Sequence, residues 1–347
     1  MEHSGVIEAR YHDSVNVLQE LFADQAALPA LSPFDRAEWY SLLADTGLTP
    51  LIAIASDADA TAALALTQER GCITPLRNWY SFTWRQLAQA NDHGDTLLVE
   101  IARQLRSRGH RVILEPVPGE DGSARRLAHA FSNAGWRVEV SRCDLNHILD
   151  VAGRNFSEYW ASRPGRLRTT LKRKAKRVEL RLTDQFDAES WEQYERIYAS
   201  SWKPKEDHPQ MLRDFAKEEA QAGRLRFGLA MAKGEAVAAQ FWTVENSVAY
   251  IHKLAHLESH RNLSAGTTLT AALFEHVIDQ DKVDLVDFGT GDQPYKADWM
   301  DSTRPRYRID CLDMKQPRAW LDLAKLAYHR LRDDEALPDL ASGSHAG

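Results

Sequence analysis

Residues 224–254 read RLRFGLAMAKGEAVAAQFWTVENSVAYIHKL, a stretch that predicts three consecutive β-strands. Residues 224–230 place apolar side chains at every second position, which is typical of a strand with one buried face. The sequences KGE at 233–235 and NS at 246–247 are turn formers, so two further strands are predicted at 236–244 and 248–254. Because both connections are short, we expect the three strands to pair in order as a meander.

A short loop, RNLSAG at 261–266, follows the meander and opens a helix predicted over 266–279. Small side chains at the start of a helix let backbone N–H groups approach a pyrophosphate closely, and the helix dipole adds attraction. A fourth strand is predicted at 283–288. We therefore expect a phosphate-binding loop, whose residues are Arg261, Asn262, Leu263, Ser264, Ala265, Gly266 and Thr267.

The rest of the chain mixes predicted helices and strands. Apolar spacing and helix-start and helix-stop residues predict helices at 15–23, 32–47, 95–106 and 124–134, and strands at 51–55, 62–67, 111–115 and 136–140. The side chains that mark one face of a further helix are Trp191, Tyr194, Ile197, Tyr198 and Trp202. A strand at 307–311 precedes a last amphipathic helix, 320–331. Because the sequence pattern changes near residue 150, we expect domains at 1–150 and 151–335 and a loose tail at 336–347.

Composition limits the class of protein. The chain has 347 residues, 44% hydrophobic and 27% charged, so it is able to bury a full core. It lacks both an apolar run of the roughly 18 residues that a membrane helix needs and a secretory signal, so we expect a cytoplasmic protein that is not integral to a membrane. The three cysteines (Cys72, Cys143 and Cys311) are far apart, which fits reduced thiols and offers no zinc spacing. The formal net charge of −7 argues against a protein that coats nucleic acid.

Three further motifs carry a resemblance to a known family. They are SPFDRAEWY at 32–40, RPGRLRTTLKRKAKRVE at 163–179 and DFGTGDQPYKADW at 287–299. Together with the loop at 261–266, their order resembles the FemAB/CelD-like branch of the GNAT acyltransferases, which is often described as having a BioF2-like acetyltransferase domain. The resemblance covers residues from about 30 to 330, and Ser264 stands where the family loop has its first glycine. It implies an α/β (α+β) fold of tandem GNAT-like domains, each with a mixed, mostly antiparallel central sheet flanked by helices.

The resemblance also implies the reaction. It implies an N-acyltransferase that moves an acyl group from acyl-CoA, with acetyl-CoA as the expected donor, to an amine. The acceptor is a small-molecule amine or a cell-envelope or polysaccharide precursor. Two alternatives stay open: a Fem-like peptidyltransferase that uses aminoacyl-tRNA, and a non-catalytic module of GNAT shape that binds an anionic partner. Serine-hydrolase, P-loop and zinc-protease motifs are missing from the sequence.

Acylation of an amine needs a base for the amine and an acid for the leaving thiolate. His252, in the third strand of the meander, is a candidate base because its ordinary pKa is near neutrality; the alternative is a strand histidine that faces solvent or a neighbour. Asp287, at the end of the fourth strand, is a second candidate that would orient or deprotonate the amine; the alternative is a carboxylate that caps the following loop. Tyr295 is the candidate acid, and its alternative role is packing on Trp299.

Four residues are candidates for binding substrate. Lys296 is expected to meet a phosphate or carboxylate of the acceptor, and Asp292, Gln240 and Arg173 complete the set. Arg173 belongs to a segment, 163–177, that holds eight Lys and Arg residues and no acid. This basic segment predicts a helix with a charged outer face, which either binds a phosphate-bearing partner or is simply solvated. His252, His256 and His260 recur at every fourth residue, but the strand pattern around them argues against a metal site.

Overall fold

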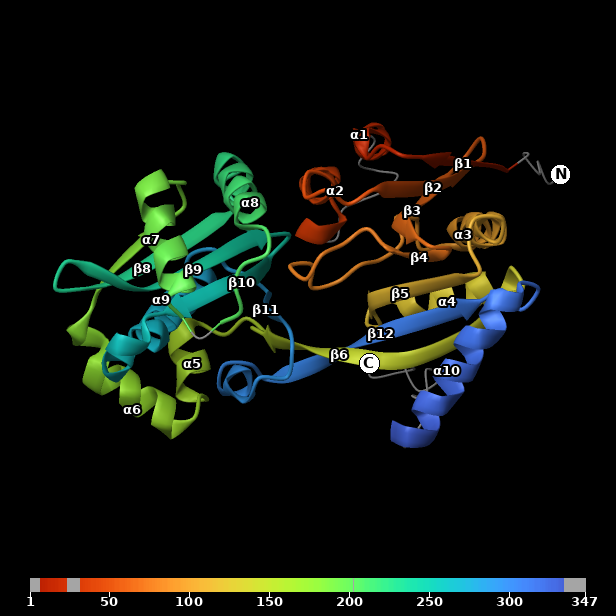
Figure 1. The fold of residues 1–347 in the computed structure, drawn as a ribbon. Helices are drawn as coiled ribbons and strands as arrows, with labels where there is room; N and C mark the ends of the chain where they lie inside the picture. Colours follow the sequence, from red (N-terminus) through yellow and green to blue (C-terminus); the bar gives the residue numbers. More distant parts are fainter. Residues whose placement is uncertain (1–6, 24–31, 202, 334–347) are drawn as a thin grey trace. The chain divides into compact units, whose positions relative to one another are not determined.

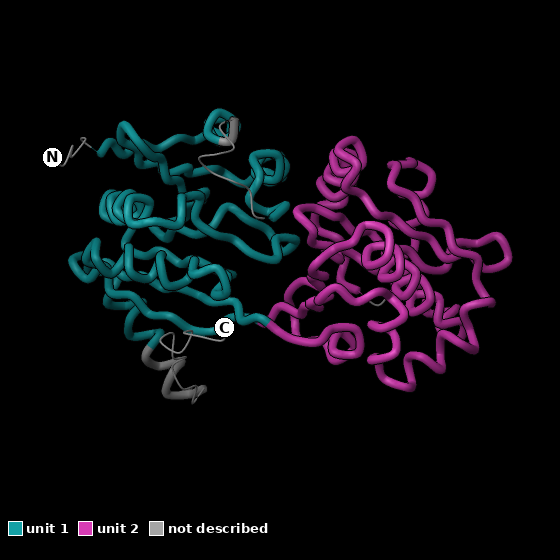
Figure 2. Tube along the Cα trace, turned by 180° about the vertical axis from the view of Figure 1, so that it is seen from behind, with its two compact units in different colours: residues 1–144, 304–347 teal, residues 145–303 magenta. Residues whose placement is uncertain are grey.

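The computed structural model describes residues 7–23, 32–201 and 203–333, which fall into two compact units (Figures 1 and 2). Unit 1 comprises residues 1–144 and 304–347, and unit 2 comprises residues 145–303. The chain therefore returns to unit 1 at its end, whereas the sequence pattern places a domain boundary only at residue 150. The domain boundaries at 1–150 and 151–335 stay a prediction, and the tail at 336–347 lies outside the described residues.

Unit 1 is a mostly antiparallel sheet with helices packed on it. Its strand order is β1-β2-β3-β4-β5-β12-β6, and the pair β4–β5 is parallel. The strands are β1 (Glu8–His12), β2 (Pro50–Ser56), β3 (Thr61–Glu69), β4 (Cys72–Pro75), β5 (Arg111–Pro118), β6 (Arg137–Asp150) and β12 (Ser302–Leu312). The helices are α1 (Asn16–Ala23), α2 (Ala37–Ala44), α3 (Asp92–Leu105), α4 (Ser123–Asn133) and α10 (Pro317–Asp333), with a short 3-10 helix at Pro33–Asp35.

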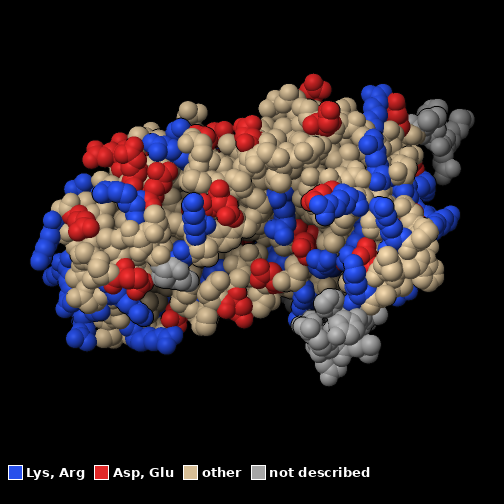
Figure 3. Space-filling model, viewed as in Figure 1, with Lys and Arg blue, Asp and Glu red and all other residues tan. Residues whose placement is uncertain are grey.

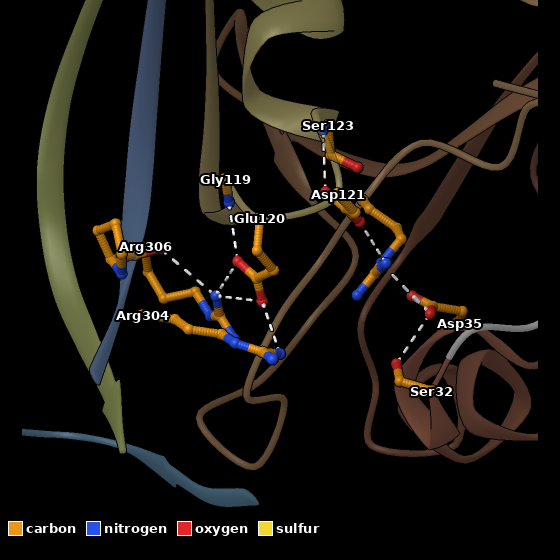
Figure 4. A network of polar contacts seen from close by, with 10 residues as sticks. Ser32, Asp35, Gly119, Glu120, Asp121, Ser123, Arg304 and Arg306 are labelled. Atoms are coloured by element: carbon orange, nitrogen blue, oxygen red, sulfur yellow. Dashed lines mark hydrogen bonds and ion pairs between the residues drawn. The ribbon is translucent and has the colours of Figure 1, made fainter. Parts of the chain in front are cut away.

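The motif at 32–40 serves as an anchor inside unit 1 (Figure 4). Asp35 is buried, and its Oδ2 accepts a hydrogen bond of 2.8 Å from Ser32 and lies 3.4 Å from Nε of Arg85. Arg85 also pairs with Asp121, whose Oδ1 accepts from the backbone N–H of Ser123 at the start of α4. Burial raises the pKa of Asp35, and the Arg85 guanidinium opposes that rise. The network ties three segments, far apart in sequence, to one another.

Unit 2 is built on the predicted meander. Its strand order is β6-β11-β10-β9-β8-β7, antiparallel except for the pair β10–β11. The strands are β7 (Glu179–Thr183), β8 (Leu225–Ala232), β9 (Glu235–Glu245), β10 (Val248–His256) and β11 (Leu285–Thr290), and the helices are α5 (Phe156–Ala161), α6 (Gly165–Lys174), α7 (Ala188–Ala199), α8 (Pro209–Gln221) and α9 (Ala265–Asp279) (Figure 1).

Two neighbouring aromatic residues of β9 show how the unit 2 helices are distributed. The ring of Trp242 lies 5.2 Å from that of Phe274 in α9. The ring of Phe241 lies 5.4 Å from Trp191 in α7 and 5.7 Å from Phe215 in α8. Because consecutive residues of a strand point to opposite faces of the sheet, α9 covers one face and α7 and α8 cover the other.

The predicted fold class, a mostly antiparallel sheet flanked by helices, is confirmed. The meander, the helix after the loop and the strand at 283–288 all form, with ends that differ by a few residues. Sequence reasoning missed β1, β4, β7, α5 and α8. Three of these five are strands of four or five residues, too short for an alternating pattern to stand out.

Removing the buried carboxylate of the unit 1 network tests its structural role. Asp35→Ala is expected to lower the free energy of unfolding by about 3 kcal/mol, since it removes the acceptor of Ser32 and one of the two carboxylates beside Arg85. Urea unfolding followed by tryptophan fluorescence measures the change. The matched control is Asp59→Ala, an exposed site where less than about 0.5 kcal/mol is expected. Equal effects at both sites would contradict the anchoring role.

Candidate functional site

The parallel strands β10 and β11 part in the middle of unit 2. Their pairing ends at Tyr250 and Asp287. Beyond that point β11 stays on β6 as far as Thr290, while β10 continues along β9 as far as His256. Among the described strands none pairs with this last part of β10 on its β11 side. Backbone N–H and C=O groups on that edge are therefore available to a ligand.

A cavity of about 710 Å³ lies at this opening. Leu254, Ala255 and His256 of β10 and Phe288 of β11 form one part of its wall. Further residues come from Glu258–Leu263, a 3-10 helix, from the first turn of α9, and from Pro294–Asp298, a second 3-10 helix. The predicted loop and the motif at 287–299 thus contribute to one cavity.

The predicted loop forms the start of α9. Ser264 adopts a left-handed conformation with φ 54° and ψ 39°, which is uncommon for a residue with a Cβ. Its Oγ accepts a hydrogen bond of 3.0 Å from Nζ of Lys174 in α6. Gly266 also lines the cavity, and a Cβ added there would meet His256 only at 3.7 Å, an ordinary contact. The first turn of α9 therefore faces the cavity with little side-chain cover.

The other loop residues differ in their access to the cavity. Arg261, Ser264, Ala265, Gly266 and Thr267 line it. Asn262 and Leu263 do not appear in its wall. Arg261 is exposed and makes no ion pair with any residue that the structure describes. A guanidinium beside an open helix N-terminus suits a phosphate group.

Gln240 lies behind this turn rather than in the cavity. It is fully buried in β9, and its Nε2 donates to the Gly266 carbonyl at 3.1 Å and to Oγ1 of Thr270 at 2.6 Å. Its Oε1 accepts from Nε1 of Trp242 at 2.9 Å. These bonds fix the first turn of α9 against the sheet. The predicted substrate contact of Gln240 stays a prediction that this buried position does not support.

The two predicted bases also lie outside the cavity wall. Nε2 of His252 is 2.8 Å from Oγ1 of Thr243, and its ring stacks on Phe241 with 4.9 Å between centres. Asp287 is buried; its Oδ2 accepts from Asn146 at 2.8 Å and its Oδ1 accepts from the backbone N–H of Gly289 at 2.7 Å. The surroundings of Asp287 match the loop-capping alternative. Catalytic roles for both residues stay predictions.

Tyr295 lines the cavity, as the predicted acid must. Its ring meets the edge of Phe288 with 5.8 Å between centres, so it packs on that residue rather than in the expected stack on Trp299. Burial raises the pKa of Tyr295, which keeps the phenol protonated at neutral pH. A neutral O–H donor on the cavity wall is able to give a proton to a leaving group.

Lys296 and Asp292 flank Tyr295 but are placed differently. Lys296 is buried, and its Nζ donates to the carbonyl of Thr290 at 2.5 Å. Asp292 is exposed, with Oδ1 3.4 Å from Nε2 of the buried His147. Neither residue belongs to the cavity wall, so their substrate contacts stay predictions.

The basic segment forms α6 and the turn after it, and Figure 3 shows Lys and Arg atoms gathered over it. Two of its arginines pair with acids: Arg163 with Asp301, and Arg166 with Asp298 at 2.5 Å. Arg173 is exposed. In the described chain the other six basic residues of the segment have no acidic partner; Arg168 donates to the Arg163 carbonyl and Lys174 to Ser264, and the remaining four are Lys172, Arg173, Lys176 and Arg177. Their charge is open to an anionic partner.

The histidines at 252, 256 and 260 have different partners. His252 bonds to Thr243, whereas His256 pairs with Glu258 at 3.3 Å. Across residues 7–23, 32–201 and 203–333, no three His, Cys, Asp or Glu side chains are grouped as metal ligands. Of the helices described, none is long and apolar enough to cross a membrane.

Sequence reasoning missed Lys203, which also lines the cavity. It follows the aromatic face of α7 directly, and no motif or periodicity singles it out. Its neighbour Lys205 is exposed, and the sequence alone does not distinguish the two.

The comparison with known families finds a match that falls within unit 2. The model of the Acetyltransferase (GNAT) domain matches residues 161–297, which include the basic segment, the meander, the loop and most of the motif at 287–299. Unit 2 contains a GNAT acetyltransferase domain. Acyl transfer is therefore the kind of reaction that the family supports. No curated protein sequence matches this chain.

Solved structures resemble the chain over nearly its whole length. FemX is 10% identical with a TM-score of 0.61, and the match covers 92% of this chain and 99% of that one. L-PGS from Bacillus licheniformis is 12% identical with a TM-score of 0.58, over 90% and 96% of the two chains. A conserved protein from Bacteroides thetaiotaomicron is 10% identical with a TM-score of 0.60, over 88% and 100%. At these identities the likeness establishes the fold alone.

Asp287 provides a test of its structural placement. Asp287→Ala is expected to lower the free energy of unfolding by about 2–3 kcal/mol, because the Asn146 amide and the Gly289 N–H lose their buried acceptor. Chemical denaturation measures this change, with Asp284→Ala at an exposed position as the control. Unchanged stability combined with lost activity would assign Asp287 to catalysis instead.

Proposed function

We propose that the protein is an N-acyltransferase that uses acyl-CoA, with acetyl-CoA as the expected donor, and acylates an amine. One observation carries the proposal: the unpaired edge of β10 and the open first turn of α9 border the same cavity. The helix turn with Arg261 suits the pyrophosphate, and the strand edge suits the thioester carbonyl. The acceptor class, a small-molecule amine or an envelope or polysaccharide precursor, follows from the family resemblance.

The residues of the cavity fit the demands of this reaction. Backbone N–H groups on the β10 edge near Leu254 and Ala255 would polarise the carbonyl that the amine attacks. Tyr295 would give its proton to the leaving thiolate, because its neutral phenol faces the same space. Calorimetry of the purified, folded chain against CoA, acetyl-CoA and longer acyl-CoAs tests the donor. Failure to bind any of them at millimolar concentration would overturn acyl-CoA as donor.

Aminoacyl-tRNA is the second candidate donor. The exposed cations of α6 favour it, because Lys174 bonds Ser264 and so places this helix beside the loop that starts α9. A polyanion on α6 would then reach the cavity. Transferase activity with acyl-CoA alone that is insensitive to ribonuclease would exclude an obligatory tRNA donor. A charge-reversal variant, Arg173→Glu, tests this donor. If the variant binds tRNA more weakly and CoA with unchanged affinity, the result supports aminoacyl-tRNA as donor.

Gly266 tests the phosphate-binding turn. Gly266→Asp is expected to abolish CoA binding, since a carboxylate would stand where the pyrophosphate is expected. Gly266→Ala is the matched control, because its Cβ fits beside His256 without a clash. Calorimetric titration with CoA checks both variants. Wild-type affinity in Gly266→Asp would show that the turn does not hold the donor.

Tyr295 tests the acid. Tyr295→Phe is expected to lower kcat by about 100-fold, with KM for the donor little changed, as for a group that acts in the transition state. Steady-state kinetics with acetyl-CoA measures both constants. A variant that turns over at the wild-type rate would remove Tyr295 from the mechanism.

A further inference from the structure

Lys203 differs from the two acidic residues of the cavity wall, which are both paired. Glu258 is paired with His256, and Asp298 with Arg166. The ammonium group of Lys203 makes no hydrogen bond or ion pair with any part of the chain that the structure describes. Its Nζ lies 5.8 Å from the centre of the Tyr198 ring, on the last turn of α7. Lys203 therefore brings an uncommitted amine to the same cavity as Tyr295.

The surroundings of Lys203 disfavour its charged form. Lys253 of β10 is buried over the same Tyr198 ring, at 5.3 Å, and its Nζ binds Oε1 of Glu206 at 2.7 Å. Oε2 of Glu206 accepts from the Tyr194 hydroxyl at 2.9 Å. Glu206, the carboxylate that acts on Lys203, is thus already used by two donors. A second ammonium beside Lys253 is repelled rather than stabilised.

These groups explain how Lys203 titrates. Burial, together with the ammonium groups of Lys253 and Lys296, lowers the pKa of Lys203 to about 8 against the opposing pull of Glu206. The groups that act on Lys203 come from β10, from its own loop and from the 3-10 helix at 294–298. A lysine in this range is partly neutral at physiological pH, as a general base needs to be.

The histidines of the cavity wall already have partners, because His256 pairs with Glu258 and Nδ1 of His260 lies 3.0 Å from Oγ of Ser259. His252 and Asp287, the bases expected from the sequence, are bonded elsewhere and do not line the cavity. We propose that the neutral amine of Lys203 removes the proton from the ammonium group of the acceptor. This inference rests on the proposed acyl transfer and names the base that this reaction requires.

The proton balance closes with Tyr295 as partner. Lys203 takes one proton from the acceptor ammonium, and the free amine forms a C–N bond to the thioester carbonyl. The C–S bond breaks, Tyr295 protonates the leaving thiolate, and the second amine proton returns to the Tyr295 oxygen. Lys203 then releases its proton to solvent. The sum is an amide, a thiol and one released proton, with no change in oxidation state.

The ionisation of Lys203 is measured without any substrate. The folded chain is treated with trace acetic anhydride across a pH series, and acetylation of each lysine is read by mass spectrometry. Lys203 is expected to gain reactivity with a midpoint near pH 8, and the exposed Lys205 serves as the comparison within the same sample. Equal profiles for the two lysines would overturn the proposal.

Kinetics then tests the role in the reaction. Wild-type kcat/KM for the acceptor is expected to rise with pH through about 8, and Lys203→Met is expected to lose about 100-fold in kcat together with this pH step. Lys203→Arg, which stays charged, is expected to be equally slow, whereas the control Lys205→Met keeps the wild-type rate and profile.

The outcomes separate this inference from the proposed function. Calorimetric binding of the donor to Lys203→Met with unchanged affinity, together with slow turnover, supports the base. Full activity of Lys203→Met with the pH step intact overturns the base and leaves acyl transfer standing. An acylated Lys203 that passes its group to the acceptor overturns it as well, because the lysine would then be the nucleophile. Absence of turnover with every acyl-CoA overturns the proposed function and this inference with it.

Discussion

The site of unit 2 depends on where two parallel strands stop pairing. β10 and β11 share only three paired positions, and each then follows its other neighbour. The separation creates an unpaired backbone edge inside a domain, and an edge of this kind is costly unless something bonds to it. A ligand bound in the cavity would provide that hydrogen-bond partner. The functional surface is therefore a consequence of strand register, and the side chains around it refine what the backbone provides.

The buried side-chain amide of Gln240 fixes the first turn of α9 relative to the strands of the sheet. Gln240 reaches from β9 to the first turn of α9, on the face opposite to the aromatic residues that contact α7. Because all its bonds are internal, the position of the turn does not depend on a ligand. Ser264 holds the left-handed entry to the helix and accepts from Lys174, so α6 is fixed to the same point. Strand edge, helix turn and basic helix are thus held by a few polar contacts.

The fold was predictable from sequence to a larger extent than the chemistry. The meander and the helix after RNLSAG follow from apolar alternation and turn residues, which are local properties. The motif at 287–299 contributes Phe288, Tyr295, Asp298 and Trp299 to the cavity wall. The candidate base was not predictable in this way. Whether His252, Asp287 or Lys203 faces the cavity is set by strand register and by a loop without periodicity. Spacing in the sequence does not encode that orientation.

Two carboxylates of the sequence motifs have structural surroundings rather than those of a proton-transferring group. Asp35 and Asp287 both stand in motifs that carry the family resemblance, and both are buried acceptors of internal hydrogen bonds. A buried carboxylate that accepts internal hydrogen bonds fixes the segments that donate to it, since its removal leaves those donors unpaired. A group that must exchange protons with a substrate needs the opposite environment. It must face the cavity, its titrating atom must be free of a hydrogen bond or ion pair, and a neighbouring like charge must disfavour its charged form. Within the described residues of unit 2, Lys203 combines these three properties, and neither carboxylate does.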